Sequence, residues 1–232
     1  MFFVHGLACD ATDWRAQVDA FSPTTTVAAC DLPGHGASPA GPADCTIEAY
    51  GRAVAAAVTE LRVPPAILVG HSMGCRVVLA ANRASPDAVA GLVLVDGSRI
   101  GAGDPEAAGQ AMADEVAGDG YLRFMRQFFE SMFVPSSDRV LARAIVDRAL
   151  RMPAPLGRPL LRDLAGWDAA EVLLKVGHRP VTGKPGLQMH GCVGINRFRG
   201  NYGRHDWVLI DAASIIPDDR EEGNPDVGSV VW

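Results

Sequence analysis

The sequence contains few of the features that mark membrane, secreted or metal-binding proteins. Its five cysteines are odd in number and scattered, without the paired CxxC spacing of a zinc or redox site. The apolar start at residues 1–4 is too short for a signal peptide, and no run approaches the ~20 apolar residues of a membrane helix. We therefore expect buried, reduced thiols in a cytoplasmic protein that does not span a membrane.

Basic charge is scarce as well. The chain has 21 Lys and Arg against 27 Asp and Glu, which gives a formal net charge of −6. Without a polybasic cluster, it lacks the electrostatic pattern of proteins that bind nucleic acid or anionic lipid. The expected partner is a small neutral or apolar molecule, and the composition predicts no particular oligomeric state.

What the sequence does contain is an alternation of short apolar runs and longer helical segments. Of its 232 residues, 48% are hydrophobic, which is ordinary for a globular domain with a substantial core. Parallel strands buried on both faces are continuously apolar, so the pattern predicts an α/β fold with a mostly parallel sheet covered by helices. The predicted strands are residues 2–4, 26–30, 66–69 and 92–95, and the predicted helices are residues 47–61 and 75–84.

A G-x-S-x-G motif, Gly70-His71-Ser72-Met73-Gly74, follows the third apolar run and precedes an alanine-rich helix. A sharp turn from strand to helix at the serine strains its backbone and exposes its hydroxyl above the sheet. The flanking residues must be small for strand and helix to approach closely, and both are glycines. We predict that Ser72 is a catalytic nucleophile; the alternative is a glycine-serine turn that arose by chance.

The motif and its surroundings resemble the α/β-hydrolase superfamily, in particular its single-domain, esterase-like members with a helical cap. A strand that runs into a His-Gly turn, His5-Gly6-Leu7, precedes the motif as in those proteins. The resemblance implies that the N–H groups of Leu7 and Met73 form an oxyanion hole, which would stabilise a tetrahedral intermediate.

Two further segments carry the same resemblance. Residues 31–38 are similar to the superfamily's Asp-x-x-Gly-x-Gly-x-Ser loop, to which we assign no chemistry. The sharp turn there favours a structural role for His35, and we expect the same of His5 and His71. Asp96 ends the fourth apolar run, at a position where some members place the catalytic acid, whereas more place it after the following strand. Asp96 is our candidate acid, with loop capping as the alternative.

The middle of the chain predicts helices separated by prolines, as expected of a cap inserted over an active site. The strongest helix, residues 121–133, carries apolar side chains at three- and four-residue spacing. Most of them should pack in the core. If this face roofs the serine, Phe128 and Phe129 would favour an apolar acyl or aromatic ester.

The resemblance extends through residues 161–168 and then stops. The segment from 177 to 203 has seven glycines and predicts a loop or disorder, and the only later strand we expect is 207–210. The start also lacks the β-hairpin common in these enzymes, so we expect a fold that is incomplete at both ends. The predicted organisation is a hydrolase core at 1–99, a cap at 100–168 and an atypical return to the core at 169–232.

Three hypotheses explain this atypical segment. In the first, the reading frame is shifted near residue 177 and truncated at its start. In the second, the enzyme recruits His178, His190 or His205 as its base. In the third, the protein is a ligand-binding or interaction protein without turnover. His178 follows an apolar run and a glycine but arrives too early in the chain for a complete sheet. His205 comes later and ranks slightly above it.

A complete triad of Ser72, His205 and Asp96 would imply acyl-enzyme chemistry. The histidine would take the serine proton, and the aspartate would orient the imidazole. The resemblance implies neither a cofactor nor a metal. A serine at the motif argues against the dehalogenase and epoxide hydrolase branches, which use aspartate. Esterase, amidase, thioesterase, lactonase, carbon-carbon bond hydrolase and cofactor-free haloperoxidase activities all remain open.

Overall fold

The computed structural model describes residues 1–62, 65–97, 104–168, 180–181, 195–200 and 203–210. The strands are β1 (Phe2–Val4), β2 (Ala28–Cys30), β3 (Ala66–His71), β4 (Val89–Val95), β5 (Pro180–Val181), β6 (Ile195–Gly200) and β7 (Gly203–Ile210). The α-helices are α1 (Arg15–Phe21), α2 (Ile47–Glu60), α3 (Met73–Ala84), α4 (Pro105–Glu115), α5 (Gly120–Glu130), α6 (Arg139–Ala149) and α7 (Ala154–Gly166). Three 3-10 turns are η1 (Ala11–Trp14), η2 (Pro42–Asp44) and η3 (Pro86–Ala88).

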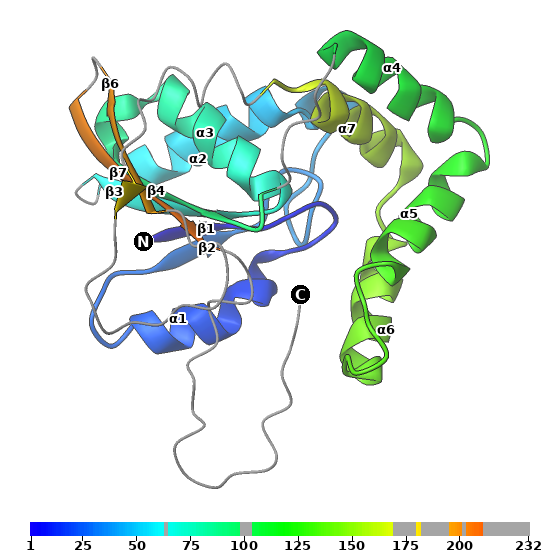
Figure 1. Ribbon diagram of the computed structural model, residues 1–232, viewed down its shortest axis with the longest axis horizontal. Coiled ribbons are helices and arrows are strands. Elements are labelled where there is room, and N and C mark those ends of the chain that lie inside the picture. The colour runs from blue at the N-terminus through cyan, green and yellow to red at the C-terminus, as the bar shows by residue number, and fades with distance from the viewer. Residues whose placement is uncertain (63–64, 98–103, 169–179, 182–194, 201–202, 211–232) are drawn as a thin grey trace, which may run out of the picture.

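Within the described residues, one sheet of seven strands runs in the order β2-β1-β3-β4-β7-β6-β5. The first five strands in this order are parallel, whereas β6 is antiparallel to β7 and β5 is antiparallel to β6. Helix α1 covers one face, while α2 and α3 cover the other (Figure 1). The predicted α/β class with a mostly parallel sheet is confirmed.

The prediction that residues 177–203 form only a loop is wrong for two stretches, because β5 and β6 lie there. In the sequence of β6, the basic Arg197 and Arg199 flank Phe198. Such alternation is typical of antiparallel strands, and a search for continuous apolar runs does not detect it. The strand expected at residues 207–210 is confirmed within the longer β7.

Alternation along β1 explains how the sheet separates two buried clusters. Phe2 and Val4 belong to the large cluster that includes α2 and α3, whereas Phe3 belongs to a smaller one with Trp14, Val69 and Val95. Successive strand residues point to opposite faces, so a continuously apolar strand supplies both clusters.

The two central helices approach each other closely. Helix α2 begins after Thr46, whose hydroxyl accepts a hydrogen bond from the Ala49 N–H at 3.1 Å. A Cβ added at Gly51 would lie 2.5 Å from the Cβ of Ala80 on α3. The glycine therefore lets α2 pack directly on α3, which is the helix that begins at the predicted nucleophile.

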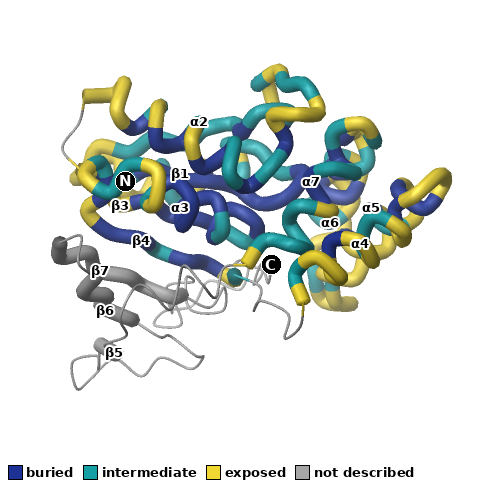
Figure 2. The backbone as a smooth tube through the Cα atoms, turned by 90° about the horizontal axis from the view of Figure 1, so that it is seen from above, coloured by how far each residue is buried: buried dark blue, intermediate teal, exposed yellow. Residues whose placement is uncertain are grey.

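Helices α4–α7 lie in the segment predicted to be a cap, and they are called the cap helices below for that reason; they form a group beside the sheet (Figure 1). Their inner side chains belong to the large buried cluster, whereas their outer surface is exposed (Figure 2). The group is also hydrogen-bonded to α2, because Asp163 accepts from the Ile47 N–H at 2.7 Å and the Trp167 indole donates to Glu48 at 2.7 Å. Across the described part of the chain, no helix combines the length and apolarity that a membrane crossing requires.

Candidate active site

The carboxyl ends of β1, β3 and β4 meet at one edge of the sheet. The register pairs Val4 with Gly70 and His71 with Val95. The residues that follow these strands, among them Leu7, Ser72 and Asp96, therefore lie along the same edge. Ligands of open α/β sheets bind at this edge, beyond the carboxyl ends of the strands.

Ser72 connects β3 to α3 in a conformation that residues other than glycine rarely adopt, with φ 51° and ψ −116°. Its N–H donates to the Val95 carbonyl at 3.0 Å, and its carbonyl accepts from the Cys75 N–H at 3.0 Å. A non-glycine residue in such a region costs on the order of 1–3 kcal/mol, and it persists only where the surroundings hold it. The strained backbone predicted for Ser72 is confirmed.

The glycines on either side of Ser72 lie where three backbones meet. A Cβ at Gly70 would be 2.3 Å from the Gly74 carbonyl oxygen, and a Cβ at Gly74 would be 2.4 Å from the carbonyl oxygen of Val4. Both distances are far below van der Waals contact. The close approach of strand and helix predicted from the motif is confirmed, and it also involves β1.

The turn after β1 packs against Ser72. A Cβ at Gly6 would be 3.3 Å from the Cβ of Ser72. The Cys9 N–H donates to the Gly6 carbonyl at 3.3 Å, so Leu7 and Ala8 are the central residues of a tight turn. The N–H groups of Leu7 and Met73 have no acceptor within the described part of the structure. Two donors without an acceptor therefore lie in the turn that packs against Ser72 and in the residue that follows it.

Two of the nearby histidines make hydrogen bonds to the backbone, His5 through both ring nitrogens and His35 through Nδ1 alone. His5 Nδ1 lies 2.8 Å from the Gly6 carbonyl oxygen, and its Nε2 accepts from the Leu32 N–H at 3.0 Å. His35 Nδ1 lies 3.2 Å from the Pro33 carbonyl oxygen. Burial lowers the pKa of His5 and lowers that of His35 to about 4. Both rings are therefore neutral, which supports the structural role expected for them.

His71 lies next to Ser72 in sequence and packs edge-on against Trp14, with ring centroids 6.4 Å apart. Burial lowers its pKa, while the charges of Asp96 and Asp13 act in the opposite direction. Asp96 follows the Val95 carbonyl that holds the Ser72 N–H. It is exposed and has φ 48°. The structure thus brings Asp96 to the same edge as Ser72, Leu7 and Met73.

The structure does not bring His205 to this edge. Ile210 on β7 pairs with Val95, which in turn pairs with His71, whereas His205 lies five residues earlier on β7. At about 3.3 Å per residue, its backbone is roughly 16 Å away along the strand, toward the opposite edge. This register counts against the predicted triad. His178 and His190 lie outside the described residues.

The two phenylalanines predicted to bind substrate have different surroundings. Phe129 on α5 is 3% exposed and packs in the large buried cluster. Phe128 is 37% exposed and stacks on Phe124, with ring centroids 5.7 Å apart. Of the two, only Phe128 has surface that a ligand can reach in this structure.

No group of three His, Cys, Asp or Glu side chains in the described ranges could hold a metal ion. Cys75, directly behind the serine, donates to the Gly70 carbonyl at 3.0 Å, and burial raises its pKa to about 12. Its thiol is therefore a structural link and a poor nucleophile.

The structure also contains a feature that the sequence did not predict, an ion-pair cluster of Asp10, Asp13 and Arg148. These residues are too far apart in the chain for a local motif to reveal them.

A model of the alpha/beta hydrolase family matches residues 1–225. Over 95 residues, the chain is 40% identical to a pimeloyl-[acyl-carrier protein] methyl ester esterase of Methylococcus capsulatus, which covers 41% of this chain and 35% of that protein. Over 97 residues, it is 30% identical to the (E)-2-((N-methylformamido)methylene)succinate hydrolase of Acinetobacter baylyi, covering 42% of this chain and 37% of that protein. The chain thus matches little more than a third of each of these curated relatives.

Solved structures share the fold over a larger part of the chain. A thermophilic esterase from Thermogutta terrifontis, with malate bound, aligns with a TM-score of 0.61 and 26% identity over 71% of this chain and 62% of that one. A hydrolase from Oleispira antarctica aligns with a TM-score of 0.64 and 15% identity over 74% and 67% of the two chains. At that identity the second likeness concerns the fold alone.

Proposed function

Because this chain belongs to the alpha/beta hydrolase family, we propose that it is a serine hydrolase that cleaves a carboxylic ester or a related acyl bond through an acyl-enzyme. The observation that carries the proposal is the conformation of Ser72, held at φ 51° at the start of α3. Strain of this kind, at the carboxyl edge of a parallel sheet, presents a hydroxyl to a substrate. The esterase and hydrolase names of the relatives support the reaction class and leave the substrate open.

The proposed chemistry has two halves. As a histidine base takes the hydroxyl proton, Ser72 Oγ adds to the substrate carbonyl carbon, and the Leu7 and Met73 N–H groups stabilise the oxyanion. The intermediate then expels the alcohol, which takes the proton from the histidine, and leaves an acyl group on Ser72. Water adds to this acyl group by the same route and releases the acid. Asp96 is the proposed carboxylate that orients the imidazole.

The proposed general base that takes the Ser72 proton is one of His178, His190 and His205. His5 is unsuitable because both its ring nitrogens are engaged, and His35 is buried with a pKa near 4. The β7 register favours the first two over His205. This part of the proposal rests on the requirement that a serine needs a base in order to act as a nucleophile.

For the cap helices, we propose that Phe128 contacts an apolar acyl or aromatic part of the substrate and that Phe129 holds α5 in place. The exposure of Phe128 and the burial of Phe129 support this division. The proposed organisation is a core at 1–99, a cap at 100–168 and a return segment at 169–232, since α4–α7 all fall within the second range.

The first experiment is labelling of the folded protein with a fluorophosphonate probe, which reacts with activated serines. We expect the wild type to be labelled and to hydrolyse nitrophenyl acetate, and Ser72→Ala to do neither. Ser85→Ala, at the other end of α3, is the matched control and should be labelled like the wild type. Circular dichroism establishes that each variant is folded.

The same assay identifies the base. Among His178→Ala, His190→Ala and His205→Ala, we expect one variant to lose labelling while the other two keep it. Labelling that persists in Ser72→Ala would overturn the assignment of the nucleophile. A folded wild type that is never labelled would instead favour a binding protein.

A further inference from the structure

One guanidinium joins the cap helices to the segment that directly follows the turn of the proposed oxyanion donor Leu7. Arg148, in the last turn of α6, donates through Nη1 to Asp10 Oδ2 at 3.1 Å. Its Nη2 donates to both carboxylate oxygens of Asp13, at 2.6 and 2.8 Å. All three side chains are about one-fifth exposed, so the cluster is largely shielded from solvent. Charge-assisted hydrogen bonds of this kind are among the strongest that side chains make.

The two aspartates also determine the shape of the chain that follows Leu7. Asp10 caps η1 by accepting from the Thr12 N–H at 2.9 Å, and Asp13 accepts from the Asp10 N–H at 3.1 Å. The segment begins at the turn closed by the Cys9 N–H and the Gly6 carbonyl. At its other end, Trp14 packs against the ring of His71, the residue before Ser72. Both ends of this segment therefore lie against residues at or next to Ser72, and the two aspartates lie between these ends.

The negative charge around η1 makes the conformation of the segment after Leu7 depend on the positive charge of Arg148. Asp31 also approaches it, accepting from the Ala11 N–H at 2.8 Å, so three carboxylates surround η1. Among the described residues, Arg148 is the only basic side chain paired with them. Partial burial opposes the charge on Arg148, but the hydrogen bonds and charge of Asp13 outweigh this effect and raise its pKa. Without the guanidinium, the carboxylates would repel one another in a partly buried site.

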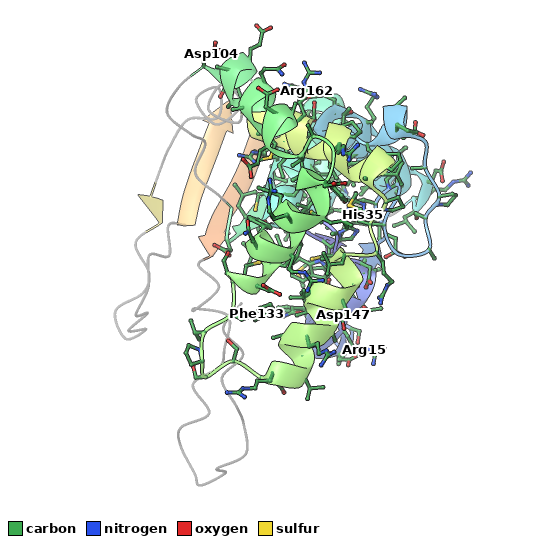
Figure 3. The ribbon with its side chains drawn as sticks, turned by 90° about the vertical axis from the view of Figure 1, so that its right-hand side faces the viewer. Arg15, His35, Asp104, Phe133, Asp147 and Arg162 are labelled. Atoms are coloured by element: carbon green, nitrogen blue, oxygen red, sulfur yellow. The ribbon has the colours of Figure 1, made fainter. Side chains whose placement is uncertain are left out.

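The side chain that provides this charge is itself fixed by the cap. Its neighbours Ile145, Val146 and Ala149 on α6 are buried in the large cluster. A displacement of α6 would therefore withdraw the guanidinium from both aspartates. Figure 3 looks onto this side of the molecule and labels Asp147, the residue before Arg148.

We propose that Arg148 is a positioning residue that holds the Leu7 N–H in place for the oxyanion and thereby couples docking of the cap helices to catalysis. The inference rests on the proposed function. It assigns Arg148 a role in the turnover step, because the N–H it positions is needed where negative charge develops. It assigns Arg148 no direct contact with the substrate.

The first test needs no activity. Hydrogen exchange of the peptide that covers residues 6–14 is compared in the wild type, Arg148→Ala and Arg143→Ala. Arg143 lies on the same helix and forms an exposed pair with Asp147, at side-chain exposures of 85% and 56%, so it serves as the matched control. We expect exchange in this peptide to be about tenfold faster in Arg148→Ala and unchanged in Arg143→Ala.

The second test separates kcat from KM with a short-chain nitrophenyl ester. We expect Arg148→Ala to lower kcat by about tenfold and to leave KM within about twofold, because a misplaced donor weakens only the transition state. Arg148→Lys keeps the charge but loses the forked geometry, so it should recover part of the kcat. If Arg148→Ala fails to fold, Arg148→Lys stands in for it in both tests.

The outcomes distinguish this inference from the proposed function. Unchanged exchange in folded Arg148→Ala would overturn the inference alone, and so would a rise in KM at constant kcat. A wild-type protein that is neither labelled at Ser72 nor active would overturn the proposed function and the catalytic part of the inference. In that case, the exchange measurement would still report whether the ion pairs hold the segment.

Discussion

Ser72 and Asp96 follow neighbouring strands, and both have left-handed backbones, with φ 51° and 48°. A third such residue, Ala8, lies in the turn that packs against Ser72. Each of these conformations is unfavourable for a residue with a Cβ, and together they gather at one edge of the sheet. Packing elsewhere must compensate for this strain. The site is therefore a place where small changes in backbone contacts should have large effects.

At the residue scale, we predict that Gly74→Ala destabilises the protein by about 1–3 kcal/mol. Alanine normally favours a helix over glycine by about 1 kcal/mol. Here the added Cβ would lie 2.4 Å from the Val4 carbonyl oxygen and 2.8 Å from that of His5, and these backbone atoms cannot rotate away. The clash should therefore prevail, and the shift of α3 should reduce labelling of Ser72.

Urea denaturation measures this effect, with Gly41→Ala as the control. Gly41 has φ −91°, and the nearest atom to an added Cβ is an Asp44 carboxylate oxygen at 3.5 Å. Its free energy of unfolding should change by no more than about 0.5 kcal/mol. If Gly74→Ala is as stable as the wild type, the close approach of α3 to β1 is not a constraint on this fold.

Much of this residue-scale geometry could be predicted from the motif, because a five-residue pattern specifies its own turn. For that reason, the sequence predicts close backbone contacts at Gly70 and Gly74. It does not predict that β1 takes part in these contacts, because the approach of β1 depends on the order of strands in the sheet. The pairing of Arg148 with Asp10 escaped prediction for the same physical reason, since the two are 138 positions apart.

At the element scale, α5 shows what periodicity can and cannot specify. Successive residues of a helix point about 100° apart, so Phe128 and Phe129 cannot both occupy the centre of one face. The spacing predicted an amphipathic helix here, and α5 confirms it. Which of the two adjacent aromatics is buried depends on where α6 and α7 pack, and this is a property of the tertiary structure.

We expect Phe128→Ala to change acyl-chain preference and Phe129→Ala to destabilise the protein. Phe129 is 3% exposed, and loss of a buried aromatic ring costs about 3–5 kcal/mol. Phe128 is 37% exposed, so its loss should cost far less. The measurements are thermal unfolding and kcat/KM for nitrophenyl acetate, butyrate and octanoate. If Phe128→Ala leaves the ratios among these esters unchanged, α5 does not contact the acyl chain.

The strands also show which elements a sequence can predict. Strands β1 to β4 could be predicted from their continuous apolar runs, because a strand buried between two layers of helices has few polar residues. In contrast, β6 owes its existence to pairing with β7 along the register of Phe198 with His205. Its own residues predict little, since the strand is stabilised by neighbours that the sequence does not identify.

At the scale of the whole molecule, buried histidines should make stability depend on pH. Burial lowers the pKa of His35 to about 4 and also lowers that of His5, whereas an unfolded histidine titrates near pH 6.5. Between these values the unfolded chain binds more protons than the folded one, so acid favours unfolding. The contribution of the buried, neutral histidines to the free energy of unfolding is complete above about pH 6.5, and it is lost as the pH falls toward their folded pKa.

We therefore predict that the free energy of unfolding decreases by on the order of 2 kcal/mol from pH 7 to pH 5 through His35 alone. Urea denaturation at the two pH values measures the decrease. His35→Gln should be less stable than the wild type at pH 7 and should show a smaller decrease, with the remainder due to His5 and His71. An equal decrease in both proteins would show that His35 does not titrate between its folded and unfolded values.

The pairing of β4 with β7 has a consequence for synthesis. Gly91 and Asp206, which face each other in this pairing, are separated in sequence by all four cap helices. A ribosome adds about 5–20 residues per second, so β7 emerges roughly 6–23 s after β4. During that interval the four N-terminal strands can associate, but the outer edge of β4 has no partner. Nascent chains should therefore be most vulnerable to aggregation, and most in need of a chaperone, while the cap is being translated.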